Sequence, residues 1–344
     1  MKKMLCMVLL LLLVLSLFSL SGCSLFKKTK PLEIVKTYPK ETAPSQIVKT
    51  ENHWVMLLST YGSQNYTISV GENLDSANSV YSVKDVSIWY FEANEKGVVW
   101  CEKSKTFYTY KAYIFETQTV ETVFQVTAGD DYQPQNVGIF RNNVYYCIID
   151  YEKQMVNVFA YDLDSKTLTA LHTAPLHEEQ QPYSINLENG HLSFVCSDKI
   201  QVLNLQNKET VFDSPIPSTV EHVFTASYDS KNDTCALYYA DNDSEDIGIL
   251  KEGETKLTSV FTFSKNHYAY MDKIECYDGH IYWIAQANVT GQVTDHYQLA
   301  DYNYLQRTAV ETDRAFDFCR DGSQLYILRF NKDGDYTHID LCQN

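Results

Sequence analysis

The side chains best suited to bind a ligand are polar or charged residues that recur between runs of apolar and aromatic residues. Each precedes or opens a short segment that is typical of a β-strand. If they converge, such groups could hold a sugar, the end of a peptide or a metal ion, or they could line a hydrated opening that holds no ligand. These candidates are Asp85, Asn136, Tyr183, His222, Asp272 and Arg314.

Tyrosines in the same connecting segments form a second candidate set. A tyrosine ring can stack on a sugar or anchor a peptide, and its hydroxyl can donate a hydrogen bond. The same rings could instead fill gaps between neighbouring units of structure, and the sequence favours neither interpretation. The set comprises Tyr132, Tyr183, Tyr268 and Tyr270.

Metal-ligating residues cluster in three places, but none has the spacing of a known metal site. Residues 172–179 carry two histidines and two glutamates in one connecting segment, whereas zinc needs three or four ligands that converge. The acidic segments 241–246 and 331–335 lack the glycine and distal glutamate of a calcium-binding EF-hand loop. Asp and Asn are also common in hairpin turns. We therefore predict no metal site and no cofactor.

The elements that must position these residues repeat along the chain. A turn pair followed by a short apolar and aromatic run occurs seven times, and the first apolar positions are 55, 98, 144, 192, 237, 281 and 325. The copies are 43 to 48 residues apart. Short strands with a period in the forties are typical of four-stranded β-propeller blades. The sequence therefore predicts an all-β propeller of seven blades, with six or eight as alternatives because the first copy is the weakest.

The two ends of the chain predict how the propeller closes. The last repeat offers three strands, at 315–319, 325–330 and 336–341, and so lacks a fourth. An alternating segment at 32–38 has no local partner. We expect this N-terminal strand to complete the last blade, because closure leaves no open sheet edge.

The N-terminal sequence predicts that the protein is located at a membrane. Two lysines precede an apolar run from Met4 to Leu20, as in a secretory signal, although a retained transmembrane anchor is the alternative. Leu20-Ser21-Gly22-Cys23 resembles the lipobox of bacterial lipoproteins, and the resemblance implies cleavage before Cys23 and lipid attachment to its thiol. The expected organisation is a signal peptide at 1–22, a lipid-anchored tether at 23–30 and a propeller domain at 31–344.

Charge limits the classes of partner. The formal charge is −16, and removing residues 1–22, which carry two lysines and no acid, changes it to −18. This acidity argues against nucleic acid as a partner, although it could simply serve solubility. Lys27, Lys28 and Lys30 lie where the tether would meet anionic lipid.

The cysteines do not form a recognisable disulfide framework. Of the nine, Cys6 would leave with the signal and Cys23 would carry the lipid. The other seven are scattered without a Cys-x-x-Cys pair, and their odd number leaves at least one unpaired. We expect most of them to be small buried side chains, while one or two bridges remain open.

The repeats resemble those of known propellers. Residues 278–283 and 318–326, with Tyr132-Gln133-Pro134 and Gln181-Pro182-Tyr183, are similar to the repeats of TolB-like propellers. They are also similar to a family of unknown function whose repeats are like those of the low-density-lipoprotein-receptor propeller. Over about residues 31–344 the chain resembles extracytoplasmic propeller lipoproteins of Gram-positive bacteria. The resemblance implies a fold and a cellular location, and no activity.

The sequence carries no catalytic signature. It has no Gly-x-Ser-x-Gly elbow, no His-Glu-x-x-His motif and no sialidase box. We therefore expect a lipid-anchored extracytoplasmic module that binds an envelope protein, a peptide or a glycan. A cell-surface enzyme acting on glycans or peptides is the alternative, because propeller enzymes can gather catalytic residues singly from several blades. A structural role within an envelope complex is the third interpretation.

Overall fold

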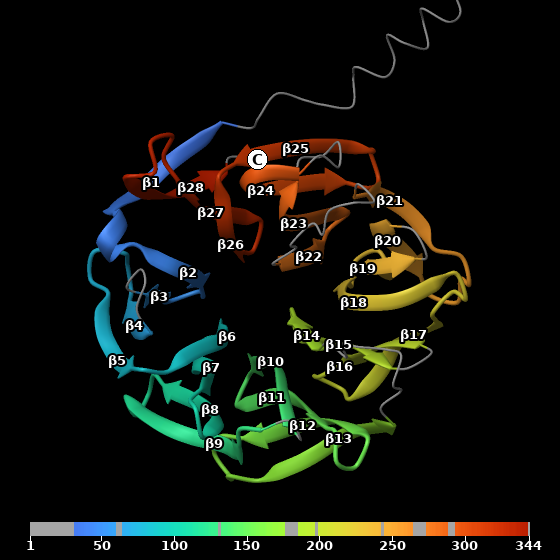
Figure 1. Cartoon of the computed structure of the whole chain (residues 1–344), viewed down its shortest axis with the longest axis horizontal. Coiled ribbons are helices and arrows are strands. Elements are labelled where there is room, and N and C mark those ends of the chain that lie inside the picture. The colour runs from blue at the N-terminus through green and yellow to red at the C-terminus, as the bar shows by residue number, and fades with distance from the viewer. Residues whose placement is uncertain are drawn as a thin grey trace, which may run out of the picture.

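The computed structural model describes residues 31–59, 64–129, 132–175, 185–196, 199–241, 244–263, 273–287 and 293–342. Seven four-stranded antiparallel sheets stand as blades around a central axis (Figure 1). In each blade the first strand lies nearest the axis. The predicted seven-bladed propeller is therefore confirmed.

The first three blades follow the chain in order from the inner strand to the outer strand. Blade 1 contains β2 (Pro44–Lys49), β3 (Trp54–Ser59), β4 (Asn65–Gly71) and β5 (Asn78–Lys84). Blade 2 contains β6 (Ser87–Ala93), β7 (Gly97–Lys103), β8 (Phe107–Ile114) and β9 (Thr119–Thr127). Blade 3 contains β10 (Tyr132–Phe140), β11 (Asn143–Asp150), β12 (Met155–Asp162) and β13 (Leu168–Pro175).

The next three blades repeat this order. Blade 4 contains β14 (Ile185–Glu188), β15 (His191–Cys196), β16 (Lys199–Asn204) and β17 (Glu209–Pro215). Blade 5 contains β18 (Val220–Asp229), β19 (Thr234–Asp241), β20 (Ser244–Lys251) and β21 (Thr258–Thr262). Blade 6 contains β22 (Lys273–Tyr277), β23 (His280–Ala287), β24 (Val293–Asn303) and β25 (Thr308–Asp313).

Blade 7 is built from both ends of the chain. It contains β26 (Ala315–Asp321), β27 (Gln324–Phe330), β28 (Tyr336–Cys342) and β1 (Leu32–Pro39). The strand β1 runs antiparallel to β28, with Leu32 opposite Cys342 and Pro39 opposite Tyr336. In Figure 1 the blue N-terminal strand accordingly lies beside the red C-terminal one. The predicted closure by the N-terminal strand is confirmed.

The hydrophobic core lies between adjacent blades rather than inside any one of them. Second strands such as β7 and β11 are buried at consecutive positions, because a neighbouring blade covers each face of the sheet. At the closure, Trp54 of blade 1 packs edge-on against Tyr326 of blade 7, with ring centroids 4.8 Å apart. The N-terminal and C-terminal parts of the chain thus share one apolar cluster.

The described cysteines behave as small apolar side chains. All of them are buried and none forms a disulfide, as expected for most of them from the sequence. These residues are Cys101, Cys147, Cys235, Cys276, Cys319 and Cys342. The side chain of Cys196 lies outside the described part of the chain.

A buried carboxylate joins blades 5 and 6. Asp229, only 1 % exposed, accepts hydrogen bonds from the backbone N–H of Gly279 at 2.7 Å and from the Tyr304 hydroxyl at 2.9 Å. Within its own blade it also accepts bonds from Asn232 and the backbone of Lys231. Although burial raises the pKa of Asp229, these donors outweigh that effect and lower it, so the carboxylate is ionised near neutral pH. Charge-assisted bonds of this kind fix the angle between neighbouring blades.

We predict that a chain lacking residues 1–40 is markedly less stable than one lacking residues 1–30. The longer deletion removes β1 and its seven paired positions from blade 7. At about 1 kcal/mol net for each backbone hydrogen bond, we expect the free energy of unfolding to fall by about 3 kcal/mol or more. Chemical denaturation of the two purified proteins measures this difference. Equal denaturation midpoints would show that β1 does not close the ring.

Candidate functional site

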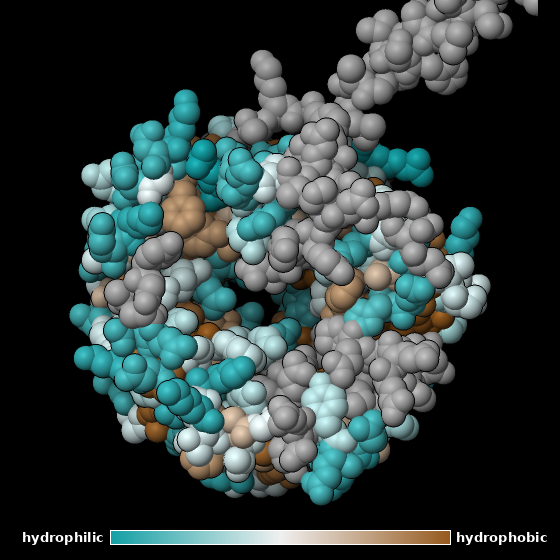
Figure 2. All heavy atoms as spheres, viewed as in Figure 1, coloured by the Kyte–Doolittle hydropathy of each residue, from teal (hydrophilic) through white to brown (hydrophobic). Residues whose placement is uncertain are grey.

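The centre of the ring encloses a cavity of about 1030 Å³. All seven inner strands, β2, β6, β10, β14, β18, β22 and β26, contribute residues to its lining. The space-filling view shows the ring hollowed at this point, within a face whose described side chains are largely hydrophilic (Figure 2). A cavity of this size is typical of small-molecule and peptide sites.

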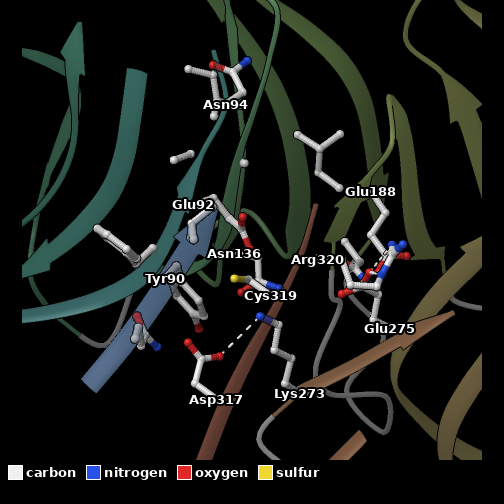
Figure 3. A pocket seen from close by; sticks show the side chains of 18 of the residues that line it. Tyr90, Glu92, Asn94, Asn136, Glu188, Lys273, Glu275, Asp317, Cys319 and Arg320 are labelled. Atoms are coloured by element: carbon white, nitrogen blue, oxygen red, sulfur yellow. Dashed lines mark hydrogen bonds and ion pairs between the residues drawn. The ribbon is translucent and has the colours of Figure 1, made fainter. Parts of the chain in front are cut away.

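Six charged side chains of mixed sign line the interior of this cavity. Four are carboxylates and two are cations, contributed by four inner strands (Figure 3). They are Glu92 of β6, Glu188 of β14, Lys273 and Glu275 of β22, and Asp317 and Arg320 of β26. We call these six residues the channel cluster. Lys49 also lines the cavity, but its ammonium group lies 3.5 Å from Asp321, the last residue of β26.

The first ion pair of the channel cluster joins blades 6 and 7. Lys273 places its ammonium nitrogen 3.4 Å from Asp317 Oδ1 and donates a 2.6 Å hydrogen bond to the carbonyl of Phe318. Burial lowers the pKa of Lys273, but the nearby carboxylates, Asp317 foremost, outweigh that effect and raise it, so the lysine is charged. Asp317 Oδ2 accepts the backbone N–H of Ile47 at 2.7 Å and so also holds blade 1. This pair is part of the framework of the ring.

The second ion pair lies on the other side of the cavity. Arg320 forms hydrogen bonds to Glu275, and its guanidinium lies 3.7 Å from the centre of the Tyr277 ring. Only 9 % of the Arg320 side chain and 12 % of the Glu275 side chain are exposed. Although burial lowers the pKa of Arg320, the charges of Glu275 and Glu188 raise it overall. A planar cation held between an aromatic face and a carboxylate has little freedom to move.

Glu188 receives a neutral donor rather than a cation. Its Oε2 accepts a hydrogen bond from the Ser227 hydroxyl, whose oxygen in turn accepts the backbone N–H of Cys276 at 2.6 Å. Burial, followed by the charge of Glu275, raises the pKa of Glu188 well above its ordinary value, although Ser227 and Arg320 offset part of the effect. Glu188 is therefore a carboxyl group whose charge the cavity does not fully compensate.

Glu92 is the second carboxyl group whose charge the cavity does not fully compensate. Within the described part of the chain it forms no ion pair, since Lys273 is committed to Asp317. Burial, with smaller contributions from Glu275 and Asp317, raises the pKa of Glu92 to about 7, while Lys273 opposes the shift. Its carboxyl group thus exchanges a proton close to neutral pH.

Tyr90 lies beside Glu92 in an unusual backbone conformation. Its φ of 52° falls in the left-handed region, which costs a side chain about 1 kcal/mol or more. The cause is a β-bulge between Trp89 and Phe91, which breaks the alternation of β6 and lets Tyr90 line the cavity. Because burial raises the pKa of Tyr90 to about 12, its hydroxyl remains a hydrogen-bond donor at neutral pH.

The predicted ligand residues are distributed differently from the cavity lining. Asn136 lines the cavity and donates a 2.8 Å hydrogen bond to the carbonyl of Ile185 in the next blade. Asp85, His222 and Arg314 are described but are not among the residues that line it. Tyr183, Asp272, Tyr268, Tyr270, Cys23 and the side chain of Tyr132 lie outside the described residues.

Most of the predicted ligand residues miss the cavity because of the direction of the inner strands. These strands run along the cavity, so a residue that precedes a strand lies at the edge of the cavity and not along its wall. Asp85 and Arg314 occupy such positions, both with positive φ, and Arg314 lies 3.6 Å from Asp313. The ring of His222 packs 4.6 Å from that of Phe224, which does line the cavity, and burial lowers the pKa of His222.

The channel cluster was not predicted from the sequence. Its one available signal was the presence of charged residues inside strands that are otherwise apolar, such as Lys273 and Glu275 around Ile274. Charges seldom occupy the interior of a protein unless they are paired or functional. With six other inner strands to consider, alternation alone did not reveal which charges would converge.

The described residues contain no group of three or more His, Cys, Asp or Glu side chains arranged to hold a metal ion. Of the two acidic segments, residues 332–335 form a turn, whereas the described residues of 241–246 belong to the strands β19 and β20. Within 241–246, Asp241 accepts hydrogen bonds from the backbone and hydroxyl of Ser244.

The fold is similar to those of solved β-propellers. The β-propeller domain of the Trilobed protease from Pyrococcus furiosus matches with a TM-score of 0.58 at 9 % identity, over 89 % of this chain and 95 % of that one. The β-propeller domain of Cps50 (Swd1) from Myceliophteria thermophila matches with a TM-score of 0.54 at 8 % identity, over 91 % and 100 %. Pyrococcus horikoshii acylaminoacyl peptidase matches with a TM-score of 0.52 at 10 % identity, over 88 % of this chain but 53 % of that one.

No protein-family model matches the chain, and no curated protein is similar to it in sequence. At identities this low, the structural likeness defines the class of protein, a seven-bladed β-propeller, and no activity. The Pyrococcus furiosus domain has an open velcro topology, whereas here β1 completes blade 7.

We predict that Glu92→Gln stabilises the protein at pH 8 and has little effect at pH 5. An acid whose pKa is raised on folding binds its proton more tightly in the native state, so its contribution to stability falls as the pH rises from its unfolded value of 4.5 to about 7. Glutamine mimics the protonated acid and avoids this loss. We expect the loss to be about 3 kcal/mol, because each tenfold change in proton affinity corresponds to about 1.4 kcal/mol.

Thermal or urea denaturation at the two pH values measures the effect of Glu92→Gln. Glu116→Gln, in the exposed turn between β8 and β9, removes the same charge outside the cavity and is the matched control. If Glu92→Gln shifts stability equally at pH 5 and pH 8, the raised pKa of Glu92 is refuted.

Proposed function

We propose that this propeller is a binding module whose ligand or partner contacts the central cavity, and that a lipid on Cys23 holds it on the outer face of the cytoplasmic membrane. The observation that carries the binding role is the convergence of all seven inner strands on one polar cavity. The mixed charges within it are fixed by hydrogen bonds from neighbouring blades, as in the pairing of Asp317 with Lys273 and Ile47. Preorganised polar groups in a concave site are what specific recognition requires.

The lining offers apolar as well as polar contacts. Phe224 and Tyr238 stack with ring centroids 4.5 Å apart and both line the cavity, as does Tyr90. Aromatic rings beside charged groups suit a ligand that has a polar end and a less polar body, such as a peptide or a sugar. The cavity therefore supports recognition of a small ligand or of a segment of a protein partner.

The lipid anchor rests on the sequence Leu20-Ser21-Gly22-Cys23, which lies outside the described residues. Within the described ranges no helix is long and apolar enough to cross a membrane. Because Leu32 pairs with Cys342, the chain enters the propeller on the face that bears the turns between first and second strands. A tether of residues 23–30 would hold that face toward the bilayer and direct the opposite face away from it.

An enzyme acting on glycans or peptides is the second candidate function. The observation that favours it is the pKa of about 7 at Glu92, since a carboxyl group that titrates near neutrality can act as a general acid or base. Glu188, with its raised pKa, is the other carboxyl group that could take part. An enzyme would lose turnover of a glycoside or peptide substrate in Glu92→Gln but would still bind that substrate.

We predict that the purified full-length chain gains thermal stability from at least one member of a panel of amino acids, short peptides and sugars. A ligand at 100 times its dissociation constant should add about 2.7 kcal/mol to the free energy of unfolding. Asn186→Trp should abolish the shift, because Asn186 lines the cavity and the larger ring would fill part of it.

Gln206→Trp places the same ring in an exposed turn and should preserve the shift. A ligand that stabilises Asn186→Trp as well as it does the unmodified protein binds elsewhere and contradicts a site in the cavity. If no panel member shifts the unmodified protein, the small-ligand form of the proposal fails, and capture of a stoichiometric membrane partner would instead indicate an assembly role.

We predict that Cys23→Ala prevents lipid attachment and cleavage. The unmodified chain should fractionate with membranes and incorporate radiolabelled palmitate, because two or more acyl chains hold a protein on a bilayer durably. The variant should remain unlabelled, as should a Cys6→Ala, Cys23→Ala double variant, whereas Cys6→Ala alone should be labelled normally. Normal labelling of Cys23→Ala would refute the anchor at this residue.

A further inference from the structure

We propose that the central cavity binds a primary ammonium group, and that Glu92 and Glu188 are the carboxylates that receive it. This inference rests on the proposed binding function and specifies the chemistry of its ligand. It follows from how the charges inside the cavity are paired.

The two cations of the channel cluster are already committed. Lys273 lies against Asp317 and the carbonyl of Phe318, and Arg320 lies against Glu275 and the ring of Tyr277. Each pair joins strands β22 and β26, so both cations serve the junction of blades 6 and 7. Neither is free to leave its partner without loss of contacts between the blades.

Two carboxyl groups on the other blades lack such partners. Glu92 comes from β6 of blade 2 and Glu188 from β14 of blade 4, and within the described chain neither forms an ion pair. Figure 3 shows Glu92 on the side of Tyr90 and Asn136, and Glu188 on the side of Arg320. The channel cluster therefore contains two more potential negative charges than positive ones, and the two carboxyl groups without an ion pair come from separate blades.

A ligand that supplies positive charge would correct this imbalance. Desolvated carboxylates bind ammonium groups through charge-assisted hydrogen bonds, which are stronger than neutral ones. The rings of Tyr90, Phe224 and Tyr238 can contact the cation or the hydrocarbon beside it. An anionic ligand would meet these two carboxylates and would have to displace Lys273 or Arg320 from its partner, so the lining disfavours it.

The charge of the ligand sets a characteristic pH dependence. Glu92 is faced by Lys273 and Glu275 of β22 and by Asp317 of β26, with Asn136 of β10 beside it in the lining. An ammonium group binds the ionised form of Glu92, so its affinity should rise with pH through the range in which that group loses its proton. From pH 6 to pH 8 we expect about a tenfold gain, given a pKa of about 7. The amine itself stays protonated there, since alkylammonium groups titrate near pH 10.4.

A series of five-carbon probes tests the proposal on the purified full-length chain. The probes are 1,5-diaminopentane, 1,5-pentanediol and glutarate, which share a chain length and differ in the charge of their ends. Calorimetry at pH 6 and pH 8 should detect the diamine, with the tighter binding at pH 8, and should give at least tenfold weaker binding of the diol and the dicarboxylate. Equal affinity for diamine and diol at pH 8 would overturn the proposal.

Isosteric variants assign the residues. Glu92→Gln should weaken diamine binding at pH 8 about tenfold and reduce its pH dependence, and Glu188→Gln should weaken it at both pH values. Glu116→Gln should leave affinity unchanged. Since glutamine resembles the protonated acid, both cavity variants should fold, which thermal unfolding checks. Unchanged diamine affinity and pH dependence in Glu92→Gln would remove that residue from the site and overturn the assignment.

The source of the ammonium group is resolved by a second pair of probes. Acetyl-Gly-Lys-Gly-amide carries only a side-chain ammonium, and its Nε-acetylated form carries none. Binding of the first but not the second, tighter than that of the diamine, would identify a lysine of a protein partner, and tighter binding of the diamine would identify a free amine. If no amine binds but a sugar or a neutral peptide does, the cation assignment fails while the proposed binding function stands.

Discussion

The structure depends on covering both faces of every blade. A four-stranded sheet whose second strand is apolar at consecutive positions, as in β7 and β11, is stable only between two neighbours. An open row of seven such sheets would leave one apolar face bare at each end. Pairing β1 with β28, and packing Trp54 against Tyr326, removes both bare faces at once. Ring closure is therefore the condition under which the remaining blades can be buried.

Closure also places seven inner strands around one axis and so creates the cavity. Any polar residue on those strands must be hydrated or paired there. The ring uses two of the resulting ion pairs as structure, because Asp317 holds Ile47 of blade 1 and Arg320 holds Glu275 of blade 6. Removing one partner of such a buried pair lowers the free energy of unfolding by far more than the intact pair contributes to it. A substitution that breaks either pair should therefore destabilise the ring. Among the described residues of the channel cluster, Glu92 and Glu188 are the two carboxyl groups that form no ion pair.

The position of a residue along its inner strand decides whether it faces the cavity. The ligand residues predicted from the sequence are those that precede or open the inner strands. Of the predicted residues that the structure describes, only Asn136 lines the cavity. Asp85 and Arg314 precede their strands in left-handed conformations and lie at the edge. Tyr90 reaches the lining because a bulge changes the alternation of β6, and a bulge cannot be recognised from a pattern of residue types.

By itself, the sequence determined the class of fold and the closing strand, and it favoured seven blades over six or eight. These follow from local rules, since a turn pair and an apolar run repeat at 43 to 48 residues and each run must be covered on both sides. Only the tertiary structure decided which charges meet. Lys273 and Asp317 meet where blades 6 and 7 pack side by side, and Glu188 of blade 4 comes within electrostatic reach of Arg320 of blade 7 because the blades surround one axis. Their convergence depends on strand register and ring geometry, and no local pattern encodes either.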